Sequence, residues 1–215
     1  TSYTFNNANY SIEAETLITV SGNEPSGERI DLHNRTKTSL TVAGDKLRCS
    51  YRLERWGADA SDLQLSEEKE QYYALGDGRY IRYSVENGSW IPSFATRLDL
   101  SLLSATGGET SLTWTSEHTG SLTSYAGSYE SFTWSDERQG YTIPVRATLN
   151  EFLGLTVNAT LTLKFREGKI AAMLISDAAI DPGISTDGLL LTDIAASVDT
   201  GVIVTYGGRT VTLPA

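Results

Sequence analysis

Cysteine, histidine and methionine are almost absent from this chain. Its 215 residues include one cysteine, Cys49, two histidines, His33 and His118, and one methionine. A single cysteine cannot form an intramolecular disulfide, and a domain of about 200 residues buries enough of its surface to fold without one. Neither histidine has a second histidine or a cysteine at a metal-ligand spacing. We therefore predict no zinc site and no catalytic thiol–histidine pair.

Positive charge and long apolar runs are also scarce. The chain has 17 Lys and Arg against 27 Asp and Glu, a formal net charge of -10. Nucleic acids and anionic lipid headgroups are poor partners for such a surface, because binding them requires a basic footprint. We expect a monomer whose acidic surface resists association. No run approaches the roughly 18 to 20 apolar residues that span a bilayer, so membrane attachment would need an anchor upstream of Thr1.

Enzyme signatures are missing as well. The chain has no nucleophile elbow, no P-loop and no dinucleotide-binding glycine motif after a strand. Glu117 with Asp136 or Glu137 could form a glycosidase-like carboxylate pair, but acidic residues at strand ends mostly add solubility. Four aspartates recur later in the chain: Asp177, Asp181, Asp187 and Asp193. They lack the order of a calcium-binding loop, so we predict no enzymatic activity, no metal and no cofactor.

What the chain does contain is a two-residue alternation interrupted by turn pairs. The best-placed pairs are Gly44-Asp45, Asp77-Gly78, Asn87-Gly88, Glu167-Gly168 and Gly207-Gly208, which tolerate the positive φ angles of hairpin turns. From Lys46 to Arg55 every second residue is apolar, and Leu155 to Phe165 repeats the pattern. Ile170 to Ile175 is apolar on both faces, which predicts a central strand. Further strands are expected over 10–20, 28–42, 70–75, 80–85, 94–103, 189–197, 202–206 and 209–213.

Two segments have a helical pattern. Ala58 to Glu70 is polar and irregular. Val145 to Leu153 places its apolar residues on one side of a short helix that Pro144 can open and Gly154 can close. We predict one β-rich domain over residues 1–215, either all-β or β-rich α+β. Its expected form is a strongly curved antiparallel meander, a half-barrel with one or two short helices on the concave face.

The segment Ser104 to Gly140 is rich in Ser, Thr, Gly and aromatic residues and contains an internal repeat. Ser111 to Gly120 matches Ser131 to Gly140, with Trp114 and Trp134 at equivalent positions. Two copies are too few for a solenoid. The simpler interpretation is two neighbouring strands with similar exit turns, and the functional one is that the two Trp residues form a binding surface.

Three segments resemble the bacterial lipoprotein-carrier superfamily of LolA/LppX-like half-barrels and related surface lipoproteins of Gram-positive bacteria. They are the hairpin from Glu70 to Trp90, the hairpin from Leu161 to Ile175, and the ending from Leu191 to Pro214. The resemblance covers under half of the chain, and Ser104 to Gly140 has no counterpart. It implies an incomplete barrel curled around helices, with an apolar cavity for acyl chains or a lipoprotein's lipid. The single expected helix is fewer than that family carries.

Two functions follow as alternatives. The first is a non-enzymatic, extracytoplasmic protein, secreted or anchored at the bacterial cell surface, that holds an apolar ligand in the concave face. The expected lining residues are Phe94, Leu98, Leu100, Leu102, Trp114, Phe132 and Trp134, which would otherwise simply fill a core. The second is a carbohydrate- or protein-binding surface module that uses Trp114, Tyr125, Tyr129 and Trp134. The first expects these Trp rings inside a cavity, and the second expects them in an exposed row.

Overall fold

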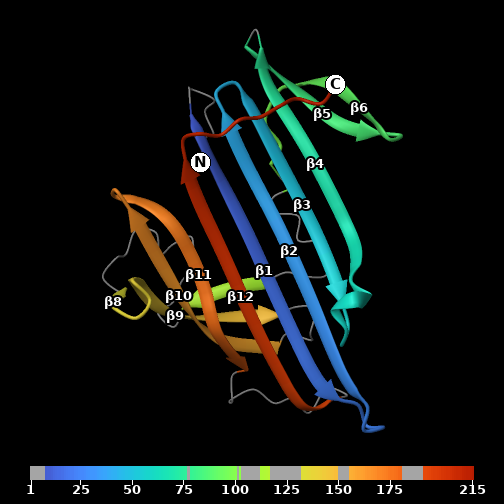
Figure 1. Ribbon diagram of the computed structural model, residues 1–215, viewed down its shortest axis with the longest axis vertical. Helices are drawn as coiled ribbons and strands as arrows, with labels where there is room; N and C mark the ends of the chain where they lie inside the picture. Colours follow the sequence, from blue (N-terminus) through green and yellow to red (C-terminus); the bar gives the residue numbers. More distant parts are fainter. Residues whose placement is uncertain are drawn as a thin grey trace.

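The fold is a single open, curved antiparallel sheet. A computed structural model of the chain describes residues 8–76, 78–100, 102, 112–116, 132–149, 155–180 and 191–215. Within them lie twelve strands in the order β6-β5-β4-β3-β2-β1-β12-β11-β10-β9-β7, with β8 also paired to β9 (Figure 1). Their bounds are β1 (Asn9–Asn23), β2 (Arg29–Ala43), β3 (Lys46–Trp56), β4 (Gln64–Gly76), β5 (Arg79–Glu86), β6 (Ser89–Ala95), β7 (Leu112–Ser116), β8 (Thr133–Ser135), β9 (Gly140–Leu149), β10 (Leu155–Arg166), β11 (Lys169–Ile180) and β12 (Thr192–Tyr206).

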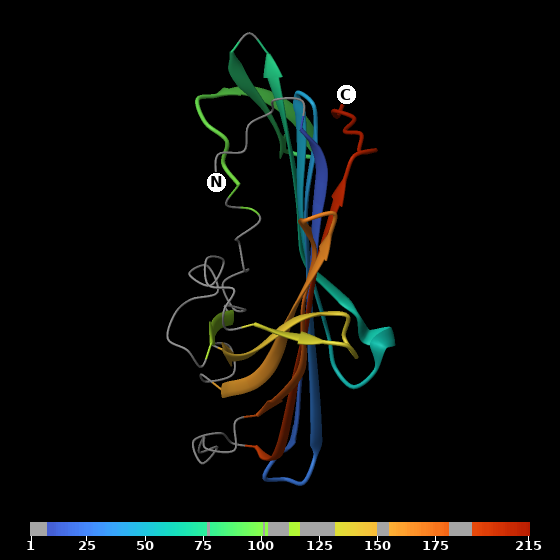
Figure 2. The ribbon, with the colours of Figure 1, turned by 90° about the vertical axis from the view of Figure 1, so that its left-hand side faces the viewer.

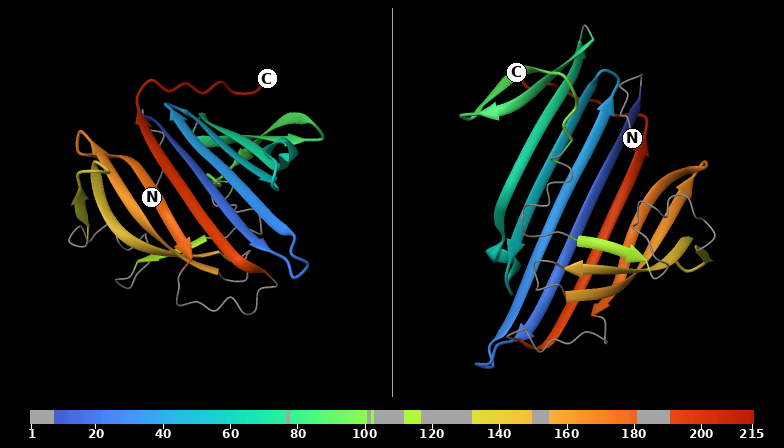
Figure 3. Two further views of the ribbon diagram at one scale, coloured as in Figure 1. Left: turned by 60° about the horizontal axis from the view of Figure 1, so that its bottom comes forward. Right: turned by 180° about the vertical axis from the view of Figure 1, so that it is seen from behind.

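The predicted curved meander is confirmed. β1 to β6 follow one another across one half of the sheet, and β9 to β12 follow one another across the other half. In side view β9 and β10 turn out of the plane of the long strands (Figure 2), and from behind β7, β9 and β10 run across those strands (Figure 3). Among the described residues β6 and β7 do not pair with each other, so the sheet is a half-barrel and not a closed barrel.

Two of the predicted glycine-containing pairs form tight hairpin turns. Asn87-Gly88 has φ angles of 50° and 78°, and Glu167-Gly168 has 51° and 74°, so both residues of each turn adopt the left-handed conformation of a tight hairpin. Gly207-Gly208 behaves differently, because the chain leaves the sheet there and the expected strand over 209–213 does not form. The Asn9 side chain holds this ending, donating to the Arg209 carbonyl (2.8 Å) and accepting from its N–H (2.7 Å).

The concave face carries two apolar clusters. The first is built on β2, β3 and β4 by Leu40, Val42, Leu47, Cys49 and Tyr73, all 2% exposed or less. The segment that follows β6 covers it, and the Tyr73 hydroxyl fastens this segment by hydrogen bonds to the backbone N–H (3.1 Å) and carbonyl (3.2 Å) of Asp99. The second cluster lies on β9, β10 and β11: Ile143, Val145, Ala159, Leu161 and Ile175. The alternating apolar residues between Lys46 and Arg55 therefore face the core, as predicted.

The predicted helix over Val145–Leu153 is wrong. Residues up to Leu149 belong to β9, in which buried Val145 lies between exposed Pro144 and Arg146. β9 pairs with β10 on one edge and with β7 on the other, and both ladders supply backbone hydrogen bonds that outweigh a weak helical preference. Ala58 to Glu70 contains a 3₁₀ turn, Ala60–Asp62, on the convex side of the sheet, opposite the predicted concave position (Figure 2). Among the described residues, no helical segment has the length and apolarity that a membrane crossing needs.

Three expected strands also differ. Of the strand expected over 94–103, Phe94 and Ala95 belong to β6, and the described residues from 96 to 100 are not in a strand. The two strands expected over 189–197 and 202–206 are one, since β12 continues through Gly201, which pairs with Leu174 of β11. β11 is central in the sheet order, but of the stretch from Ile170 to Ile175 only Ile175 is buried.

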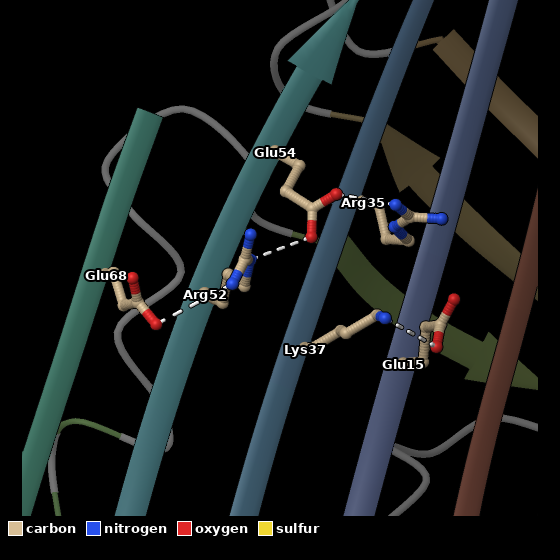
Figure 4. Close-up of polar contacts among 6 residues, drawn as sticks. All are labelled: Glu15, Arg35, Lys37, Arg52, Glu54 and Glu68. Carbon is tan, nitrogen blue, oxygen red and sulfur yellow. Dashed lines mark hydrogen bonds and ion pairs between the residues drawn. The ribbon is translucent and has the colours of Figure 1, made fainter. Parts of the chain in front are cut away.

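The convex face of β1 to β4 carries a ladder of ion pairs (Figure 4). Glu54 on β3 accepts from Arg35 (2.5 Å) and Arg52 (2.9 Å), and Arg52 reaches Glu68 on β4 (3.7 Å). The Glu54 side chain is only 5% exposed, so its negative charge is stabilised by these arginines and not by water. The hydrogen bond from Arg35 holds the pKa of the Glu54 carboxyl below its ordinary value. Opposite charges on neighbouring strands stabilise the alignment of β2, β3 and β4.

We predict that Arg35→Met lowers the free energy of unfolding by about 1–2 kcal/mol at pH 7, because a nearly buried carboxylate loses a charged hydrogen bond. The depressed pKa means that this stabilisation is present above the ordinary glutamate value of 4.5 and disappears as the pH falls through the lower folded value. Denaturant titrations of both proteins at pH 7 and pH 3 measure the difference. Lys37→Met is the control, since the pair of Lys37 with Glu15 is half-exposed on both sides. An equal loss in both variants, or a loss as large at pH 3 as at pH 7, would contradict the prediction.

The single thiol should be inert in the folded protein. Cys49 is 0% exposed, and burial raises its pKa to about 12. Because the thiolate is the reactive form, we expect no reaction with a disulfide reagent at pH 8 in buffer and complete reaction in guanidinium chloride. A thiol that reacts in buffer as fast as free cysteine would show that the first core cluster is open.

Candidate functional site

A cavity of about 390 Å³ lies at the end of β8, β9 and β10. Its lining residues are Phe132, Tyr141, Leu163, Phe165 and Gly168. The volume lies within the range of small-molecule pockets, which are mostly apolar with few polar groups. Here the lining side chains are apolar or aromatic, and the hydroxyl of Tyr141 is the polar group among them. The arrangement is suited to burying an apolar ligand.

Strand register brings these side chains together. Tyr141 on β9 lies opposite Leu163 on β10 and opposite Trp134 on β8, so the three residues form one row across three strands. Phe165 lies two residues beyond Leu163 on the same face. Two of the lining residues, Phe132 and Leu163, also pack against the second core cluster. The cavity is thus an extension of the core toward the sheet edge.

The aromatic rings of the site touch edge to face. The Trp134 and Tyr141 ring centroids are 5.2 Å apart at an interplanar angle of 73°, and those of Tyr141 and Phe165 are 6.0 Å apart at 80°. The three residues are 49%, 44% and 40% exposed. Trp134 donates its indole N–H to a carboxylate oxygen of Asp136 (2.8 Å), which satisfies its one polar group. What remains accessible on Trp134 and Phe165 is apolar ring surface, and covering it with a ligand is favourable.

The structure separates the predicted lining residues. Phe132 lines the cavity, and Trp134 packs against its wall. Leu98, Leu100 and Leu102 pack against the first core cluster instead. Phe94 is 76% exposed. It pairs with Ile81, which pairs with Ala74, so it lies on the face of the sheet opposite Tyr73. The Arg79 guanidinium lies over its ring, 5.7 Å from the centroid. Trp114 pairs with Ala147 on β9.

The two repeat segments do not place their Trp residues side by side. β7 and β8 pair with the same edge of β9, Trp114 opposite Ala147 and Trp134 opposite Tyr141, so the two strands follow one another along that edge. The proposed carboxylate partners Asp136 and Glu137 are exposed in the turn between β8 and β9. Glu117, His118, Tyr125, Tyr129, Asp181 and Asp187 lie outside the described residues.

The polar residues that the sequence singles out form no metal centre in the described part of the chain, where no group of three or more His, Cys, Asp or Glu could hold an ion. His33 is half-buried, stacks on Trp56 with centroids 5.0 Å apart, and bonds the Thr19 hydroxyl through Nδ1 (3.1 Å). Asp177 and Asp193 adopt φ angles of 56° and 49° in strand irregularities, which is ordinary for aspartate.

Four cavity residues were not among the predicted site residues: Tyr141, Leu163, Phe165 and Gly168. The alternation over Leu155 to Phe165 does assign Leu163 and Phe165 to the inner face. No short segment of the sequence, however, indicates that these residues lie beside Trp134. That follows only from the register between β8, β9 and β10.

Comparison with known proteins adds little. Neither a protein-family model nor a curated protein sequence matches the chain. One solved structure to which it is similar is a beta-barrel-like protein of the domain of unknown function DUF1849 from Brucella abortus, at 8% identity and a TM-score of 0.19, covering 93% of this chain and 99% of that one. A TM-score this low supports no conclusion about the present chain.

Proposed function

We propose that this chain is a non-enzymatic, extracytoplasmic binding protein that holds an apolar ligand, an acyl chain or lipid, in the cavity between β8, β9 and β10. The observation that carries the proposal is the cavity of about 390 Å³ walled by Phe132, Tyr141, Leu163 and Phe165. Each Å² of apolar surface that a ligand removes from water contributes about 25 cal/mol. Binding would therefore come from burial and would require no charged group.

The orientation of the rings favours this ligand over a carbohydrate. Sugar rings stack on the flat faces of aromatic side chains, and a binding platform of that kind needs several faces turned the same way. Trp134, Tyr141 and Phe165 instead meet at angles of 73° and 80°, which walls a hollow. The half-exposure of Trp134, at 49%, supports the second candidate, a surface module for carbohydrate or protein.

The location outside the cytoplasm belongs to the same proposal. It rests on the sequence resemblance to the LolA/LppX-like half-barrels, for which the open curved sheet is the expected architecture. A monomer is the corresponding assembly.

The test is calorimetric titration with dodecanoate of the wild-type protein and of Phe165→Gln. We expect wild-type binding, and a loss of about tenfold in affinity for the variant, because one aromatic wall contributes about 1.5 kcal/mol or more when it is covered. Phe94→Gln is the matched control. Phe94 is more exposed than Phe165, on the other face of the sheet, and its variant should bind as the wild type does.

Absence of dodecanoate binding, or an equal loss in both variants, would refute the proposal. Retention of a sugar on a glycan panel that Trp134→Ala abolishes, without dodecanoate binding, would establish the surface-module alternative instead.

A further inference from the structure

The cavity lies between two hairpins. The β8–β9 hairpin supplies Phe132 and Tyr141, and the β10–β11 hairpin supplies Leu163, Phe165 and Gly168. Backbone pairing between the hairpins ends at Tyr141 and Leu163. Among the described residues, β8 pairs with β9 alone, from Thr133 to Ser135. A contact that reaches from this hairpin to the other would fix the wall beside β8 more firmly.

Arg138 makes that contact. It lies in the turn of the β8–β9 hairpin, where its N–H bonds the Ser135 hydroxyl (3.3 Å). Its guanidinium reaches β11, donating to the Ser176 hydroxyl (2.6 Å) and pairing with the Asp177 carboxylate. Since β10 lies between β9 and β11, the Arg138 side chain spans β10 to reach Ser176. Ser176 lies opposite Thr160 and directly follows the core residue Ile175, which places this contact on the convex face. The clamp, defined as Arg138 with Ser176 and Asp177, thus joins the two hairpins.

The backbone around the clamp is shaped to bring the turn close to β10. Gln139 and Asp177 adopt φ angles of 49° and 56°, and Asp177 lies where the β10–β11 register shifts. A Cβ at Gly140 would come within 2.7 Å of the Leu163 carbonyl oxygen and of Thr162 Cγ2, so glycine is what permits the approach. Thr162, which the alternation assigns to the solvent side, is only 2% exposed. The turn therefore packs directly onto β10.

We infer that Arg138 is a positioning residue that holds the wall of the cavity beside β8, with Phe132 and Trp134, against the β10–β11 hairpin and so sets how closely this wall fits the ligand. The inference rests on the proposed function for its ligand, but the clamp itself acts on the protein with or without a ligand. The Arg138 side chain is 30% exposed and that of Asp177 is 64% exposed. At that exposure an ion pair adds little to global stability, so its removal should change the site and leave the fold intact.

The test compares Arg138→Met, which keeps the aliphatic stem and removes the charge, with wild type. Dodecanoate affinity should fall by about fivefold, the low end of energetic coupling between sites. Acrylamide quenching of Trp134, taken as the difference between each protein and its Trp134→Phe counterpart, should increase. Exchanging the charges in Arg138→Asp with Asp177→Arg should restore part of both signals, which a merely local effect of losing Arg138 would not allow.

Arg146→Met is the matched control. Arg146 lies on β9 and bonds Asn158 on the adjacent strand β10 (3.4 Å), so we expect its loss to leave both readouts unchanged. Wild-type quenching and affinity in Arg138→Met would overturn the inference while the proposed function stands. If wild type does not bind dodecanoate, the proposed function fails, and the quenching difference alone decides whether the clamp holds the wall beside β8.

Discussion

Pairing between the first and last strands holds the two halves of this molecule together. β1 and β12 run side by side from Tyr10 and Tyr206 to Asn23 and Thr192. In the described part of the chain, this ladder is what joins the meander of β1 to β6 to the strands β7 to β11. Nearly the whole sequence separates the partners, so the loop-closure entropy is lost before the ladder can compensate for it. We expect slow folding for that reason.

The two faces of the sheet carry different kinds of side chain. The concave face carries the apolar clusters and the cavity, while the convex face of β2 to β4 is aligned by charged rungs around Glu54. The convex face of β9 to β11 repeats the scheme with one arginine across three strands. In both places polar groups behind the sheet fix the strands whose apolar residues face the interior.

Local patterns predicted the strands better than they predicted the site. The alternation from Lys46 to Arg55 and the turn Asn87-Gly88 are determined by neighbouring residues, and the structure has both. The helix predicted from Val145 onward was wrong. Apolar residues four apart, such as Val145 and Leu149, also fit a helix, but pairing on both edges of this segment stabilises a strand.

The site could be found only in part for the same reason. Phe132 and Trp134 stood out by composition, but their neighbours Leu163 and Phe165 come from a strand whose register with them is not encoded in any short segment. Leu98 and Leu100 have the apolar alternation of a strand, yet they serve as a cover over the first cluster.

An open sheet leaves strand edges on which another chain could assemble. β6, at one end of the sheet order, contains Pro92. Proline has no amide hydrogen, so an incoming strand lacks one hydrogen-bond donor there. This margin of the half-barrel is thereby a poorer template for the addition of another strand.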